Sequence, residues 1–315
     1  MKTPLLFTAF TLTGCFLGLF SSQAPAMQRD SIDHIAVLRK TAPYNRKSDQ
    51  SFPAFTYQAA SDPHLTQLRL TYNLDSVVGK GDEITRAIRL LQWFHDQVPH
   101  ADVRPLKVLT ASNIIETYKK TKFAQGCYPL SIAMNEIFLS MGIKSRSVIC
   151  FSGRFPVPAG GHVINSVYID SLNKWIYMDP QENAYIKDEK GNFLSIAEVR
   201  ERLIDGRPLV LNKTANYHQI PAKKEEYLYQ FMAEHLYRMI CPLHSEWDSQ
   251  TREEGKTMEY VELLPYGSQE PAIDGYETKK HEKYTVISYH TNNDLLFWQK
   301  PNSNHFFEDL KRLTF

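Results

Sequence analysis

Three side-chain types that together can cleave an amide bond occur between residues 127 and 179: a cysteine, a histidine and an aspartate. Cys127 directly follows Gly126 and precedes apolar residues at three- and four-residue steps: Leu130, Ala133, Met134, Ile137, Phe138 and Met141. This period predicts a helix that Gly142 can end. Cys127 would then lie at the helix N-terminus, where free N–H groups and the helix dipole favour the nucleophilic thiolate. The structural alternative is a small buried hydrophobic residue that begins a helix.

The histidine and the aspartate lie on two predicted strands, 162–169 and 174–179, on either side of a four-residue hairpin turn, 170–173. If the turn centres after its first residue, His162 lies directly opposite Asp179. If it centres after its second residue, the two are diagonal neighbours on the same face. Both registers place imidazole and carboxylate together, whereas an odd-length loop or a bulge would separate them.

A cysteine, a histidine and an aspartate arranged in this way would catalyse acyl transfer. The carboxylate would fix the imidazole tautomer, and the other ring nitrogen would take the thiol proton. Thiolate attack on a carbonyl gives an acyl-enzyme that water or an amine resolves. Backbone N–H groups at the helix start, including that of Cys127, are natural oxyanion donors. Side-chain candidates for the same role are Gln125, Trp93 and Tyr128. The alternative for His162 and Asp179 is an ordinary hydrogen-bonded pair on a half-buried hairpin.

Helices are expected before the cysteine, over residues 30–40, 82–98 and 110–121. Asp82 and Ser112 are candidate N-caps, and residues 65–78 fit either a strand or a helix. His95 and His100, at or after the end of the second helix, are expected to be surface or satisfied core histidines.

Strands dominate after the cysteine helix. Residues 145–151 are rich in β-forming types, and Lys256–Leu263, Lys283–His290 and Asp294–Gln299 are further strand candidates, with an exposed loop between the first two. Helices are expected from the capping box at Ser195 to Gly206 and over 225–240, and 213–223 is expected to be a polar linker. Helices followed by antiparallel strands indicate an α+β fold rather than alternating βαβ units.

The first 26 residues resemble a secretory signal peptide, because Lys2 precedes an apolar run that ends near Ala24-Pro25-Ala26. Lipidation at Cys15, within Leu12-Thr13-Gly14-Cys15, is the minority interpretation. The run is short for a membrane span, and no transmembrane segment is expected after it. The 36 basic and 35 acidic residues of the whole chain nearly balance, which gives no reason to expect nucleic acid as a partner.

Three cysteines remain after the predicted signal peptide: Cys127, Cys150 and Cys241. Either Cys150 and Cys241 form a disulfide bond, or all three thiols are free. No CxxC pair or HExxH motif is present, so neither a metal nor a cofactor is expected. The chain is also rich in aromatic residues, and its tryptophans could line a stacking cleft or simply pack in the core: Trp93, Trp175, Trp247 and Trp298.

The motifs together resemble the core of the transglutaminase-like superfamily over about residues 80–190. The resemblance rests on four features: Gly126-Cys127, the stretch from Gly142 to Val148, His162 at a strand start and Asp179-Pro180 at a strand end. The stretch from Gly142 to Val148 contains Arg146 and is similar to a Gly-x-x-Arg-x-Val motif with one additional residue. The resemblance implies a papain-like α+β core with Cys127 as nucleophile, His162 as base and Asp179 as orienting carboxylate.

The resemblance does not imply one reaction. The family includes crosslinking transglutaminases, peptidases, amidases that strip glycans from asparagine, and members that have lost activity. The order Gln125-Gly126-Cys127 departs from the Gly-Gln-Cys of the animal crosslinking enzymes.

The sequence therefore predicts a signal peptide (1–26), an N-terminal extension (27–79), a transglutaminase-like core (80–212) and a C-terminal helix plus β extension (213–315). The predicted function is a secreted or periplasmic acyl-transfer enzyme with a Cys127–His162–Asp179 triad. Its substrate would be a peptide, protein or peptidoglycan-like amide. The alternative is an inactive module that binds an envelope peptide or glycan. Hydrolysis or transamidation, and the oligomeric state, stay open.

Overall fold

The computed structural model describes residues 32–41, 43–46, 52–153, 161–265 and 275–301. Asp33–Phe315 form one compact unit. The predicted signal peptide and Cys15 lie outside the described residues, so both stay predictions. Among the described residues, no helix has the length and apolar content needed to cross a bilayer.

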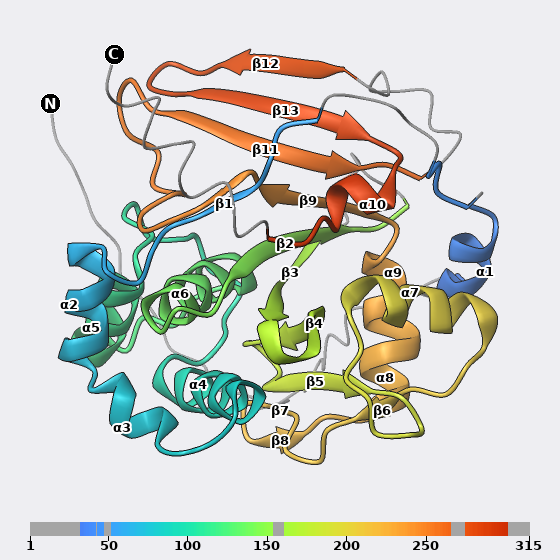
Figure 1. Ribbon diagram of the computed structural model, residues 1–315, viewed down its shortest axis with the longest axis horizontal. Coiled ribbons are helices and arrows are strands. Elements are labelled where there is room, and N and C mark those ends of the chain that lie inside the picture. Colours follow the sequence, from blue (N-terminus) through green and yellow to red (C-terminus); the bar gives the residue numbers. More distant parts are fainter. Residues whose placement is uncertain (1–31, 42, 47–51, 154–160, 266–274, 302–315) are drawn as a thin grey trace, which may run out of the picture. The chain divides into compact units, whose positions relative to one another are not determined.

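The first part of this unit is helical, and the helices precede the main sheet strands in the chain (Figure 1): α1 (His34–Arg39), α2 (Pro63–Thr71), α3 (Leu74–Val78), α4 (Glu83–Gln97), α5 (Ala111–Thr121) and α6 (Cys127–Ser140). Asp82 caps α4 as predicted. The predicted cap at Ser112 is wrong, because Thr110 has the extended backbone of an N-cap and its side chain accepts a hydrogen bond from the Asn113 N–H.

The ambiguous segment 65–78 is helical. It forms α2 and α3, which meet at Asn73 in a left-handed conformation with φ 50°. Gly142, with φ 76°, directly follows the end of α6, where the sequence predicted a stop.

A nine-stranded sheet runs through the described residues in the order β12-β13-β11-β9-β2-β3-β4-β5-β6. The strands are β2 (Ser145–Phe151), β3 (Gly161–Ile169), β4 (Lys174–Asp179), β5 (Ala184–Lys187), β6 (Val210–Leu211), β9 (Arg238–Pro242), β11 (Thr257–Leu263), β12 (Tyr276–Lys280) and β13 (Thr285–Thr291). Neighbours are antiparallel except β11 and β13, which are parallel. The fold is α+β, with a mixed sheet rather than the wholly antiparallel one expected.

Two apolar clusters cover the opposite faces of β3 and β4 (Figure 1). On the first face, helices α2–α6 pack against Val167, Ile169, Ile176 and Met178. The second face presents Ile164 and Tyr177 to α7 (Ile196–Asp205), to the π-helical segment η2 (Tyr227–Met232) and to α9 (Ala233–His235). Because side chains alternate along a strand, His162 and Asp179 point to this second face.

The C-terminal part differs most from expectation. The helix predicted over 225–240 ends at His235, after α8 (Lys224–Glu226), η2 and α9, and Met239 and Ile240 instead lie in β9. Pairing of β9 with both β2 and β11 satisfies its backbone and buries Met239, so tertiary pairing outweighs the helical spacing.

Further segments also differ from expectation. The segment 294–299, expected to be a strand, contains the short helix α10 (Asp294–Phe297), capped by Asn293. The expected linker 213–223 contains a hairpin, β7 (Asn216–Tyr217) with β8 (Ile220–Pro221). The expected loop before β13 contains β12, and two short segments not expected to be strands, β1 (Thr56–Tyr57) and β10 (His244–Ser245), pair in parallel.

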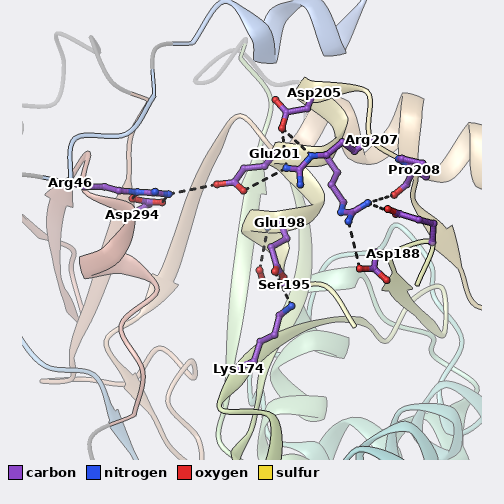
Figure 2. Close-up of polar contacts among 12 residues, drawn as sticks. Arg46, Lys174, Asp188, Ser195, Glu198, Glu201, Asp205, Arg207, Pro208 and Asp294 are labelled. Atoms are coloured by element: carbon purple, nitrogen blue, oxygen red, sulfur yellow. Dashed lines mark hydrogen bonds and ion pairs between the residues drawn. The ribbon is translucent and has the colours of Figure 1, made fainter. Parts of the chain in front are cut away.

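Helix α7 is fastened to its surroundings by charged contacts (Figure 2). The predicted capping box is confirmed, since Ser195 and Glu198 bond each other's backbone N–H groups. Lys174 at the start of β4 donates to Glu198 at 2.8 Å. Arg46 lies between Asp294 of α10 at 2.7 Å and Glu201 of α7 at 3.6 Å. These contacts hold α7 over the second face.

The buried side-chain amide of Asn165 links β3 to α6 by hydrogen bonds. Asn165 Nδ2 donates to the Ser131 carbonyl oxygen at 3.0 Å, and Ser131 Oγ donates to Asn165 Oδ1 at 3.0 Å. Ser131 lies about one helical turn after Cys127, and Asn165 lies three residues after His162. The reciprocal pair therefore fixes the first half of α6 against the middle of β3.

Replacing Asn165 with alanine is expected to lower the free energy of unfolding by about 2 kcal/mol, because the buried Ser131 hydroxyl loses its acceptor and the Ser131 carbonyl oxygen keeps only the Ser147 hydroxyl as a side-chain donor. Urea unfolding measures this loss as a lower midpoint. Gln92→Ala on the exposed side of α4 is the matched control and should leave the midpoint nearly unchanged. Equal midpoints for Asn165→Ala and the wild type would contradict the importance of this pair.

Candidate active site

Cys127 is the first residue of α6, directly after the N-cap Gly126. Its N–H therefore has no carbonyl partner within its own helix. The side chain is half-buried, and Sγ lies 3.9 Å from the Gly161 carbonyl oxygen at the start of β3. The cysteine thus meets the strand that carries His162.

The β3–β4 hairpin has the second of the two registers considered. Asn165 pairs with Met178, and the chain turns through a four-residue loop that ends at Asn173, with φ 48°. The turn therefore centres after its second residue and leaves His162 diagonal to Asp179. His162 Nε2 lies 2.7 Å from Asp179 Oδ2, and both side chains are almost fully buried.

The pKa of the Cys127 thiol is shifted in the opposite direction from the pKa values of the Cys150 and Cys241 thiols. Burial raises its pKa, but hydrogen bonds with His100 and His162, the charge of His162 and the Val163 N–H outweigh burial and lower the pKa from 9.0 to about 6. Burial raises the pKa of Cys150 far above its ordinary value and that of Cys241 to about 12. All three thiols are free, which is the second of the two cysteine alternatives.

The imidazole of His162 is held as a cation. Burial lowers its pKa, but the charge and hydrogen bond of Asp179, together with Cys127, outweigh burial and raise the pKa to about 10. Between about pH 6 and pH 10 the site therefore holds a thiolate beside an imidazolium. Nε2 of His162 faces the carboxylate, so Nδ1 is the nitrogen left for the sulfur.

Asp179 receives hydrogen bonds on both oxygens. Tyr227 Oη donates to Oδ2 at 2.6 Å, and the N–H groups of Gln181 and Glu182 donate to Oδ1 at 2.9 and 3.4 Å. Burial raises the pKa of this carboxyl group, but the charge of His162 and these donors outweigh burial and lower it.

Tyr227 and Phe231 of η2 are site residues that the sequence analysis missed. The Tyr227 hydroxyl also bonds that of Tyr177 at 2.5 Å, and the ring of Phe231 packs edge-on against the His162 ring at 4.9 Å. The aromatic side chains therefore shield the ion pair from solvent. Their four-residue spacing on a predicted helix was the only available signal.

The three side chains considered as oxyanion donors each contact another group. Gln125 Nε2 donates to the Ala124 carbonyl oxygen, and the Trp93 ring packs against Tyr72. Tyr128 Oη donates to Gln250.

The two histidines expected to be structural differ from each other. His95 is satisfied as predicted, with one ring nitrogen 3.0 Å from the Pro180 carbonyl oxygen and the other 3.0 Å from Asn216 Oδ1. His100 instead acts on Cys127, because its side chain helps to lower the pKa of that thiol. Sequence spacing gave no sign of this contact.

Known proteins resemble this chain over part of its length. Residues 71–180 match the family model of the Transglutaminase-like superfamily. A solved structure described as a "putative cysteine protease" from Cytophaga hutchinsonii is 15% identical, with a TM-score of 0.30, over 58% of this chain and 52% of that one. The chain thus spans about half of that protein. No curated protein matches the sequence.

The matched segment, residues 71–180, contains helices followed by a β-hairpin, and its cysteine begins the helix α6, which packs against that hairpin. This segment is similar to the core of the transglutaminase-like superfamily, the family that the motifs predicted.

Replacing Tyr227 with phenylalanine removes a hydrogen bond to a buried carboxylate and is expected to cost about 2 kcal/mol of unfolding free energy at pH 7. A carboxyl group whose pKa is lowered by folding stabilises the protein above its unfolded pKa of 3.8, and this contribution is lost as the pH falls through the folded value. The difference between Tyr227→Phe and the wild type should therefore shrink in acid.

Urea unfolding at several pH values measures this difference. Tyr229→Phe, in the same helical segment, is the control and should have little effect. A Tyr227→Phe penalty that is absent at pH 7 would contradict the assignment of Tyr227 to the charged carboxylate, and so would a penalty that does not shrink as the folded protein takes up the proton of Asp179.

Proposed function

We propose that this chain is a cysteine-dependent acyl-transfer enzyme that acts on amide bonds through Cys127, His162 and Asp179. The observation that carries the proposal is the convergence of an imidazolium, held by a buried carboxylate, on a half-buried thiol whose pKa is lowered to about 6. The family match supports a cysteine-protease-like function at the level of the superfamily.

The arrangement suggests a two-step reaction. The Cys127 thiolate attacks the amide carbon, so a C–S bond forms and the carbonyl π electrons move to oxygen. When the intermediate collapses, the C–N bond breaks and the leaving nitrogen takes a proton from the His162 imidazolium. Water, or an amine in a transamidation, then attacks the thioester carbon and gives a proton to His162. When this second intermediate collapses, the C–S bond breaks and Cys127 leaves as the thiolate. Asp179 orients the ring and stabilises its charge in both steps.

An inactive binding module is less well supported. Such a module has no need of a half-buried thiol with a lowered pKa. Two of its candidate stacking residues are engaged in packing: Trp175 lies against the Arg146 guanidinium at 4.3 Å, and Trp247 stacks on His64 at 3.8 Å.

Export from the cytoplasm is a separate part of the proposal, which depends on residues 1–26. Mass spectrometry of the mature protein is expected to find Met27 as its first residue. A lipid on Cys15 would support the anchored alternative, and an intact Met1 after expression in the native host would contradict export.

The direct test is turnover of a library of peptides and peptidoglycan fragments by the wild type and by Cys127→Ala. We expect the wild type to cleave or transfer at least one class of amide and Cys127→Ala to lose at least about 10⁴-fold in rate, because no nucleophile remains. The kcat/KM profile should rise as the thiolate forms near pH 6 and fall as His162 loses its proton near pH 10.

Cys150→Ala is the matched control, since that thiol is buried and its pKa is raised. Turnover that survives in Cys127→Ala, or a folded wild type that binds amides without converting them, would contradict the enzyme assignment.

A further inference from the structure

His100 is fixed beside the nucleophile by backbone pairing. It forms a parallel bridge with Gln125, two residues before Cys127. The Ala101 N–H donates to the Gln125 carbonyl oxygen at 2.9 Å, and the Gln125 N–H donates to the Pro99 carbonyl oxygen at 3.3 Å. The His100 side chain is buried, and its imidazole is near enough to the Cys127 thiol to help lower the pKa of that thiol.

The β7–β8 hairpin supports His100 from the other side. Tyr217 Oη lies 2.9 Å from His100 Nδ1, and His218 Nε2 donates to the His100 carbonyl oxygen at 2.8 Å. His218 and Gln219 at the hairpin tip have φ of 52° and 65°, as both central residues of a two-residue type I′ turn require.

The neighbours of the imidazole determine which ring nitrogen carries the proton. Tyr217 occupies Nδ1, so Nε2 is left for the sulfur of Cys127 and for Asp102 Oδ1 at 3.6 Å. Sulfur and carboxylate are both acceptors here, so Nε2 carries the hydrogen and Nδ1 accepts from the tyrosine hydroxyl. The result is a fixed N–H donor beside the nucleophile.

We propose that the Nε2–H of His100 and the backbone N–H of Cys127 together stabilise the oxyanion that forms when the thiolate attacks the substrate carbonyl. The inference rests on the proposed function and supplies the side-chain donor that Gln125, Trp93 and Tyr128 do not. The oxyanion forms within reach of both donors, and no proton leaves His100 in the step. The two histidines have different roles, because His162 pairs with the buried Asp179 whereas the Asp102 beside His100 is exposed.

The test compares amide turnover with alkylation of Cys127 by iodoacetamide, because alkylation is a displacement that forms no oxyanion. Both rates are measured at pH 8.5, where the thiolate is formed. For His100→Phe we expect turnover to fall by about 10² to 10³-fold, while alkylation changes by no more than about threefold. His100→Gln, which restores an N–H donor, should recover at least about tenfold of the lost turnover.

Tyr217→Phe keeps His100 but removes the hydroxyl that holds the hydrogen of its ring on Nε2. We expect this variant to lose less amide turnover, about tenfold. His281→Phe, at an exposed position, is the control. Circular dichroism checks that each variant is folded, and if His100→Phe is not folded, His100→Gln and Tyr217→Phe decide the question.

The outcomes separate the two proposals. If Cys127→Ala abolishes turnover and His100→Phe does not reduce it, the role of His100 is wrong and the enzyme assignment stands. If His100→Phe reduces turnover and alkylation equally, His100 acts only on the thiolate and the oxyanion role is again wrong. If Cys127→Ala keeps full turnover, the proposed function itself fails.

Discussion

The structure depends on a charged pair that has almost no contact with water. His162 and Asp179 are 1% and 0% exposed, and removing two charges from water costs several kcal/mol for each ion. This cost is offset only where the remaining hydrogen-bonding positions are filled. The donors to Asp179 come from three elements: β3, the turn after β4, and η2. The pair therefore depends on the helical segment η2 of the second face, which supplies Tyr227. This segment lies outside residues 71–180, which the family model matches.

The two faces of the β3–β4 hairpin contribute different parts of the site. Helix α6 belongs to the first face and brings Cys127 to the start of β3, where the Asn165–Ser131 pair fastens it. The second face holds the histidine, the aspartate and their aromatic cover. Sulfur and imidazole can meet only at the strand end, since the sheet separates the faces elsewhere. A one-residue slip of the hairpin would move His162 to the wrong face.

The sequence predicted what depends on local spacing. The Cys127 helix, the hairpin turn and the capping box at Ser195 each have a short-range pattern that the structure follows. It did not predict what depends on distant partners. Met239 fits a helical period, yet β2 and β11 pair with its segment, and nothing around His100 indicates the hairpin that supports it. The proximity of His162 to Asp179 was therefore predictable from the sequence, whereas the groups that orient them were not.

The claim that Cys127 is a thiolate held by an imidazolium is tested most directly by titrating its reactivity. The rate of alkylation by iodoacetamide would be measured against pH for the wild type and for His162→Ala. The account predicts a half-maximal rate near pH 6 for the wild type and a shift toward 9.0 in the variant. A wild-type midpoint near 9.0, or a profile that His162→Ala leaves unchanged, would contradict it.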